Sequence, residues 1–149
     1  MAEAQAALAP FPALAAAGPL HDAEKEYAEA RLTVALVADS PLPSHQDLGV
    51  GAGAWLNGLC EAASELRRYL LDRLRSGDTA RADALLGAMN DVYDTLVSID
   101  YPDAVTGGLR RSTDVLRAVL ERTRGDLTTT VLQTRLQAAI ETRLPPAPE

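Results

Sequence analysis

Residues 56 to 78 read LNGLCEAASELRRYLLDRLRSGD, and this stretch decides the fold class. Leucines at positions 56, 59, 66, 70 and 74, with Ala63 between them, recur at steps of three and four, which is the spacing of one face of an α-helix. Gly77 then suits the left-handed position that follows a helix, and Asp78 suits the cap of the next helix. The stretch therefore predicts a helix over residues 54 to 76 and a tight helical hairpin.

The same start and stop signals divide the chain on either side of this hairpin. Asp22 can cap a helix that no breaker interrupts, and prolines and glycines over residues 40 to 53 then predict a loop. The predicted helices cover residues 22 to 38, 54 to 76, 80 to 99 and 109 to 124, with a last one after Gly125 and Asp126. No segment alternates apolar and polar residues as a strand does. The sequence predicts an all-α fold, an antiparallel bundle of about five helices.

The length of 149 residues and the hydrophobic content of 47% predict one domain with one core. Residues 1 to 21 are rich in alanine and broken by prolines, so we expect a disordered or loosely helical lead-in. We expect residues 22 to 144 to form the helical domain and residues 145 to 149 to form a tail. The lead-in has no Lys or Arg before its apolar run, unlike a signal peptide, and no apolar stretch reaches the length of a membrane span. Cys60 is the one cysteine, which excludes an intramolecular disulfide, so we expect a cytoplasmic protein without a membrane partner.

The charge of the chain limits how it could bind a nucleic acid. The formal net charge is -7, and of the 14 basic residues only Lys25 is a lysine, so the field of the whole molecule repels phosphate. Any RNA contact must therefore come from local arginine clusters. The arginines of two predicted helices are the candidates: Arg67, Arg68, Arg73 and Arg75 on one, and Arg110, Arg111, Arg117, Arg122 and Arg124 on the other. Of these, Arg67, Arg68, Arg110 and Arg111 are our predicted nucleic-acid-binding residues. The alternative for each of these arginines is a solvated helix face or an ion pair with a carboxylate.

Carboxylates are the remaining candidates for chemistry, because the sequence has no glycine-rich phosphate loop, GxSxG, HExxH or paired CxxC motif. Glu26 and Glu29 are three residues apart on one predicted helix, and Glu61 and Glu65 are four apart on the next, so each pair shares one sector of its helix. Two such pairs facing each other would supply the oxygen ligands that Mg²⁺ or Mn²⁺ prefers. The alternative is a solvated face, because such spacings arise readily in a chain with 21 acidic residues.

Two segments resemble the translin family of single-stranded nucleic-acid-binding proteins. Residues 56 to 78 are similar to its signature. In this signature an acidic residue follows a glycine-containing apolar turn, and Glu-Leu and a basic residue come four residues after it. The segment EYAEA, residues 26 to 30, is similar to the EYxEA element of the catalytic branch, which includes translin-associated factor X. The resemblance covers about residues 22 to 142. One departure is at the front, where an alanine and proline lead-in replaces the family's Lys- and Arg-rich helices.

The resemblance implies a site and an activity. By position, Glu26, Glu29, Glu61 and Glu65 fall on the acidic residues of the metal-dependent ribonuclease site. Glu61 is one methylene longer than the aspartate of the animal catalytic subunits. We therefore expect a protein that binds single-stranded RNA and cleaves it as a Mg²⁺- or Mn²⁺-dependent endoribonuclease. Single-stranded DNA is a further candidate ligand. The resemblance also implies a closed, hollow homo-oligomer. The alternatives are a non-catalytic single-stranded RNA- or DNA-binding module and a structural helical adaptor.

Overall fold

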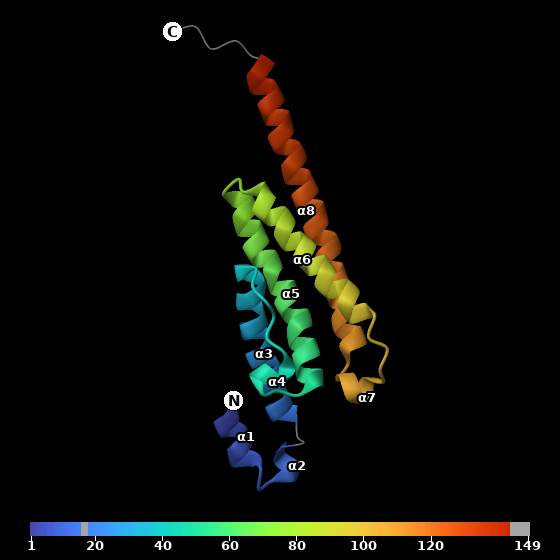
Figure 1. Ribbon diagram of the computed structural model, residues 1–149. Coiled ribbons are helices and arrows are strands. Elements are labelled where there is room, and N and C mark those ends of the chain that lie inside the picture. The colour runs from blue at the N-terminus through green and yellow to red at the C-terminus, as the bar shows by residue number, and fades with distance from the viewer. Residues whose placement is uncertain (16–17, 144–149) are drawn as a thin grey trace.

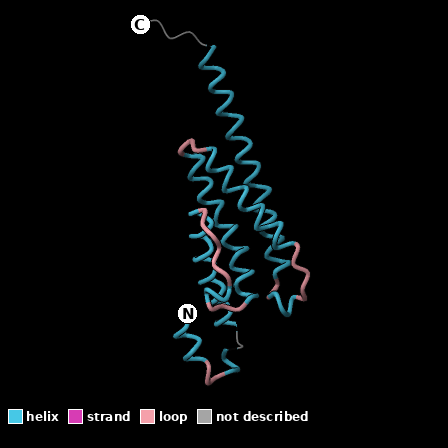
Figure 2. The backbone as a smooth tube through the Cα atoms, viewed as in Figure 1, coloured by secondary structure: helices cyan, strands magenta, loops and turns pink. Residues whose placement is uncertain are grey.

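The computed structural model describes residues 1 to 15 and 18 to 143, and these residues form helices and connecting loops without a strand (Figures 1 and 2). The helices are α1 (Ala2–Leu8), α2 (Pro12–Ala15), α3 (Gly18–Ala38), α4 (His45–Leu48), α5 (Ala52–Arg75), α6 (Thr79–Val97), α7 (Asp103–Thr106) and α8 (Leu109–Arg143). The predicted all-α fold is confirmed. The predicted tail, residues 145 to 149, lies outside the described residues.

Helix α5 is the centre of the bundle, because α3, α6 and α8 all pack against it, and α6 also packs against α8. The leucine stripe that predicts α5 faces this core: Leu66 and Leu70 are fully buried, and Leu59 is nearly so. Leu32, Met89 and Leu116 are fully buried core side chains of α3, α6 and α8 respectively. Burial of these large apolar side chains is the main stabilising term of such a fold.

The α5–α6 hairpin is confirmed in its details. Gly77 has a φ of +77°, and the Asp78 carboxylate accepts a hydrogen bond of 3.0 Å from the backbone N–H of Arg81. Left-handed backbone at Gly77 costs little because glycine has no Cβ, and the Asp78 cap satisfies a free N–H at the start of α6. The chain therefore reverses direction within the residues that the pattern marks.

Helix α3 runs parallel to α5, which differs from a bundle of purely antiparallel neighbours. Near the start of both helices, the backbone N–H of Gly51 donates to the Glu24 carboxylate at 3.0 Å. Near the other end, the Arg81 guanidinium donates to the backbone carbonyl of Val37 at 2.6 Å. The connection over residues 39 to 51 returns along the length of the bundle before α5 begins, so α3 and α5 point the same way (Figure 1).

Two predicted helix boundaries are wrong. Helix α3 begins at Gly18, before Asp22, because a proline such as Pro19 is tolerated in the first turn, where its missing N–H has no partner to lose. The lead-in therefore contains α1, α2 and the first turn of α3. Helix α8 continues through Gly125 and Asp126 instead of ending there. A mid-helix glycine costs only about 1 kcal/mol, and burial of Leu120 and Leu127 on either side offsets that cost.

Helix α8 extends past the other helices at its C-terminal end (Figure 1). Leu132, Leu136 and Ile140 repeat at steps of four on this extension, and all three are exposed. In the part of the chain that the structure describes, no helix combines the length and the apolar character needed to cross a membrane.

Helices α3 and α5 are in close contact at Gly58. A Cβ atom at this position would lie 2.8 Å from the backbone oxygen of Lys25, 2.9 Å from the Cβ of Ala28 and 3.0 Å from the backbone nitrogen of Glu29. Carbon atoms do not pack at such distances, and two of the three neighbours are backbone atoms that cannot rotate away. The absence of a side chain at Gly58 therefore sets the distance between the two helices.

We predict that Gly58→Ala lowers the free energy of unfolding by about 1–3 kcal/mol, because the added methyl group forces α3 away from α5. Gly87→Ala is the matched control, since Gly87 lies in α6 with nothing within 4 Å of its added Cβ. This control should be stabilised by about 0.5–1 kcal/mol through helix propensity. Urea unfolding of the three proteins measures both effects, and equal stability of the two variants would contradict the close approach.

We also predict that Gly125→Ala stabilises the protein by about 0.5–1 kcal/mol, since Gly125 has ordinary helical surroundings with nothing within 4 Å of its added Cβ. If α8 were instead broken at Gly125 with a left-handed residue, alanine would be strained there and the variant would lose stability. The urea midpoint decides between these two outcomes, and far-ultraviolet circular dichroism reports the helix content.

Candidate functional site

Three of the four predicted carboxylates meet between α3 and α5. Glu26 and Glu29 project from α3 and Glu61 from α5, and one oxygen of each lies within 4.8 Å of the others. The contact at Gly58 explains this arrangement, because Glu61 follows Gly58 by three residues and therefore lies about one turn further along the same side of α5. We call Glu26, Glu29 and Glu61 the carboxylate triad.

Lys25 supplies a positive charge to the carboxylate triad. Its Nζ lies 2.8 Å from Oε1 of Glu61, to which it donates a hydrogen bond, and 3.5 Å from Oε1 of Glu26. The hydrogen bond to Glu61 raises the pKa of Lys25, and partial burial opposes this effect. The ammonium group therefore remains charged and links α3 to α5.

Crowding of negative charge is visible at Glu29. Its pKa is raised, first by partial burial and then by the negative charges of Glu61 and Glu26. Because the site disfavours the ionised form of the Glu29 carboxyl group, it needs additional positive charge to keep that group ionised. The Lys25 ammonium lowers the pKa of Glu29 only as a minor contribution, so it does not fully meet that need.

The donor set and its spacing fit a divalent cation with oxygen ligands. Mg²⁺ holds its ligands at about 2.1 Å, so two oxygens across the ion are about 4.2 Å apart. The triad oxygens all lie within 4.8 Å of one another, which is close to the separations that ligands of one such ion adopt. Glu26 is exposed and Glu29 and Glu61 are half-buried, so one side of the site is open to solvent.

Glu65 does not join the triad in this arrangement. It lies one turn beyond Glu61 on α5, and its carboxylate pairs with Arg68 at 3.3 Å. Arg68 itself is exposed, and an exposed pair of this kind contributes little to stability. The structure thus places two of the predicted site residues, Glu65 and Arg68, against each other.

Asn57 ties the start of α8 to α5 close to the triad. The Asn57 side chain is buried, and its Nδ2 donates to the backbone carbonyls of Gly53 at 2.9 Å and of Thr106 at 2.7 Å. Its Oδ1 accepts a hydrogen bond of 2.8 Å from the Ser112 hydroxyl. Because Asn57 and Glu61 are neighbours on one face of α5, this network holds the first turn of α8 beside the triad.

Arg111 is the predicted arginine that shares a cavity with one residue of the triad, Glu61. It precedes Ser112, is exposed, and lines a small cavity of about 160 Å³ together with Glu61. The remaining residues that line this cavity are Cys60, Ser64, Ser112 and Val115. Among the described residues, Arg111 has no ion pair with a carboxylate. Its guanidinium is therefore available to an anion that approaches Glu61 from the α8 side.

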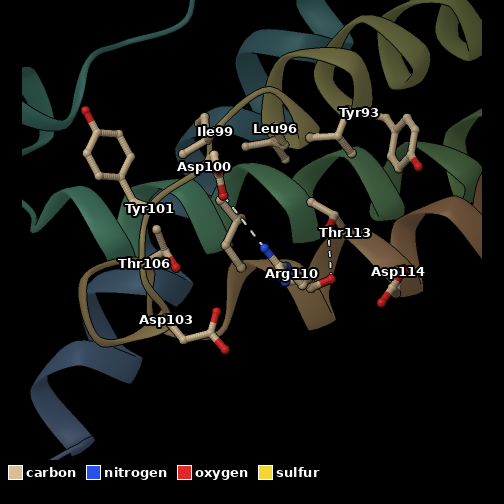
Figure 3. A pocket seen from close by; sticks show the side chains of 12 residues that line it. Tyr93, Leu96, Ile99, Asp100, Tyr101, Asp103, Thr106, Arg110, Thr113 and Asp114 are labelled. Carbon is tan, nitrogen blue, oxygen red and sulfur yellow. Dashed lines mark hydrogen bonds and ion pairs between the residues drawn. The ribbon is translucent and has the colours of Figure 1, made fainter.

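Arg67 and Arg110 have other surroundings. Arg67 donates to Thr123 at 3.0 Å and to Asp126 at 2.7 Å, so its guanidinium is used to join α5 to α8. Arg110 points into a larger cavity of about 450 Å³ between α6, α7 and α8, where it pairs with Asp100 at 3.8 Å (Figure 3). Asp103 and Asp114 line the same cavity, which makes it a poor place for a phosphate.

Reasoning from the sequence missed two residues of this site, Lys25 and Asn57. Lys25 is recognisable only as the single lysine of the chain, one position before Glu26. Asn57 is recognisable as a polar residue within an apolar helical stripe, where a buried amide requires hydrogen-bond partners. The partners of both residues come from other helices, so no local pattern predicts them.

Comparisons with known proteins agree with the fold and with the resemblance of the two segments. No protein-family model matches the chain. The uncharacterized protein MJ0175 of Methanocaldococcus jannaschii is 30% identical over 131 residues, which are 87% of this chain and 58% of that protein. The chain therefore spans little more than half the length of this curated relative.

Two solved structures have the same fold at detectable sequence identity. The structure of AfC3PO in complex with duplex RNA has a TM-score of 0.75 and 30% identity, over 88% of this chain and 66% of that one. A crystal structure of AfC3PO has a TM-score of 0.70 and 34% identity, over 76% of this chain and 60% of that one. AfC3PO is an archaeal member of the translin family. The fold and the identity together show that this chain is a translin-like protein.

Proposed function

We propose that the chain binds RNA and cleaves single-stranded RNA with the help of Mg²⁺ or Mn²⁺. The observation that carries this proposal is the carboxylate triad of Glu26, Glu29 and Glu61 beside the unpaired guanidinium of Arg111. The similarity to AfC3PO, which has been solved with duplex RNA, supports RNA as the ligand class. The preference for a single strand rests on the resemblance to the translin family.

Each residue of the site has a role in the proposed reaction. Glu26, Glu29 and Glu61 would hold the divalent ion, which supplies Lewis acidity for phosphodiester hydrolysis. Arg111 would orient the phosphate from the α8 side, because a guanidinium matches the geometry of phosphate oxygens. Glu65 lies one turn away and would complete the ligand set after leaving its exposed partner Arg68.

We further propose that the chain works as a homo-oligomer. The exposed stripe of Leu132, Leu136 and Ile140 on the extension of α8 supports this, since helices with such stripes associate to bury them. An assembly with its triads facing inward would also reconcile the net charge of -7 with RNA binding, because only the inner wall must attract phosphate.

A cleavage assay tests the catalytic part of the proposal. Labelled single-stranded and duplex RNA should be incubated with Mg²⁺, Mn²⁺ or EDTA, and we expect cleavage of the single strand only when a metal ion is present. Glu29→Gln and Glu61→Gln should each slow cleavage by about a hundredfold or more, since each removes a charge that holds the ion. Glu121→Gln is the control, because Glu121 is exposed on α8 and pairs with Arg124. Binding without cleavage under every metal condition would instead support the non-catalytic module.

The neighbouring arginines at the start of α8 provide a second test. Arg111→Gln should weaken RNA binding, and the slope of log affinity against log salt should become shallower by about 1, as expected for the loss of one phosphate contact. Arg110→Gln removes the same charge from the adjacent position but from the cavity that contains Asp100, so it should change the affinity far less. Fluorescence anisotropy over a range of salt concentrations measures both. Equal losses for the two variants would show that the contact is unspecific.

A further inference from the structure

Lys25 is placed in a way that the proposed reaction does not use. It is the single lysine of the chain, its side chain is only 22% exposed, and its Nζ contacts two of the three triad carboxylates, Glu61 at 2.8 Å and Glu26 at 3.5 Å. A surface lysine normally keeps its ammonium in water, but this one directs the ammonium into the triad. The chain thus provides its own cation where the divalent ion would bind.

The ammonium and a divalent ion would compete for the same carboxylate, that of Glu61. Oε1 of Glu61 receives the short hydrogen bond from Lys25, and Glu61 is also the only triad member from α5. An ion that takes this oxygen as a ligand removes the acceptor from Lys25 and repels its positive charge at short range. Since the ammonium is carried on a flexible four-carbon side chain, it can leave the triad without movement of α3.

The geometry also indicates where the released charge is useful. Glu61 lies between Lys25 of α3 and Arg111 of α8, because it bonds the first and shares a cavity with the second. A phosphate held by Arg111 at the metal ion would therefore lie within the region that the Lys25 stem can reach. A second positive charge on the α3 side would then face an anion instead of a carboxylate.

We propose that Lys25 is an exchangeable counter-ion, which neutralises the triad in the metal-free protein and is displaced by the divalent ion onto an RNA phosphate. This proposal rests on the proposed metal site. Its consequence is that metal and RNA bind with positive coupling, because the metal ion releases a charge that RNA can use. By linkage, RNA must tighten metal binding by the same factor.

Nuclear magnetic resonance tests the displacement directly. In protein labelled with ¹³C,¹⁵N-lysine, the side-chain Nζ gives a single signal, since Lys25 is the only lysine. We expect the signal to shift when Mg²⁺ is added and to shift again when RNA is added in the presence of Ca²⁺, which replaces Mg²⁺ so that the RNA stays intact. RNA added in EDTA should leave the signal near its metal-free position. A signal that does not move at metal saturation would overturn the proposal.

Binding measurements on two variants give the second readout. Lys25→Met should bind Mn²⁺ about fivefold or more tightly than the wild type, because the competing ammonium is gone, and its RNA affinity should rise less than that of the wild type when Ca²⁺ is added. Arg31→Met is the matched control, since it removes one positive charge from the same helix at a residue that contacts Tyr27. It should leave both the Mn²⁺ affinity and the coupling unchanged.

The outcomes separate this proposal from the one on which it rests. If neither the wild type nor Lys25→Met binds Mn²⁺ by water-proton relaxation, the metal site itself is overturned and the counter-ion role with it. If both bind Mn²⁺ with equal affinity and the Lys25 signal stays fixed, the metal site remains and only the role of Lys25 is overturned. Unfolding of each variant in urea with EDTA confirms that the comparison is made on folded protein.

Discussion

The close approach of α3 to α5 at Gly58 is the constraint on which the rest of the site depends. With no side chain at this position, the backbone of α3 at Lys25 and Glu29 lies against α5. The next turn of α5 then brings Glu61 to Glu26, Glu29 and the Lys25 ammonium. One missing methyl group therefore brings an acidic pair on one helix and an acidic residue on another into a single site. The same packing continues into the core through the buried Ala28 and Leu32.

This constraint also imposes an electrostatic cost that shapes the behaviour of the site. Packing three carboxylates together raises the pKa of Glu29 through burial and through its acidic neighbours, and the hydrogen bond to Glu61 raises the pKa of Lys25. Burial is the largest cause of the raised pKa of Glu29, and the negative charges of the acidic neighbours contribute to both shifts. Under the proposed function, a divalent ion at the triad would relieve this excess of negative charge, and the neighbouring Arg111 would face the phosphate.

Much of the fold could be predicted from local pattern, because local physics decides it. The leucine stripe of α5 and the pair Gly77 and Asp78 predict the hairpin that the structure contains. The predicted helix end at Gly125 is wrong because glycine, which can end a helix, is also tolerated within one when both flanking turns are buried. Helical spacing placed the glutamates in pairs but could not show that Glu65 faces Arg68, nor that the adjacent Arg110 and Arg111 enter different cavities. Those outcomes depend on which helices pack together and in which direction.

The distribution of charge determines how an acidic chain of this kind could bind RNA at all. Three of the four candidate arginines lie beside carboxylates, Arg67 beside Asp126, Arg68 beside Glu65 and Arg110 beside Asp100, and of these pairs that of Arg67 is the least exposed. Lys25 likewise lies beside carboxylates of the triad. Arg111 alone of these residues offers an uncompensated charge beside Glu61, against a net charge of -7 for the whole chain. One phosphate contact of that kind is weak, and under the proposed function a divalent ion at the triad would add to it. The ion would add two positive charges at the triad and, by displacing Lys25, a third.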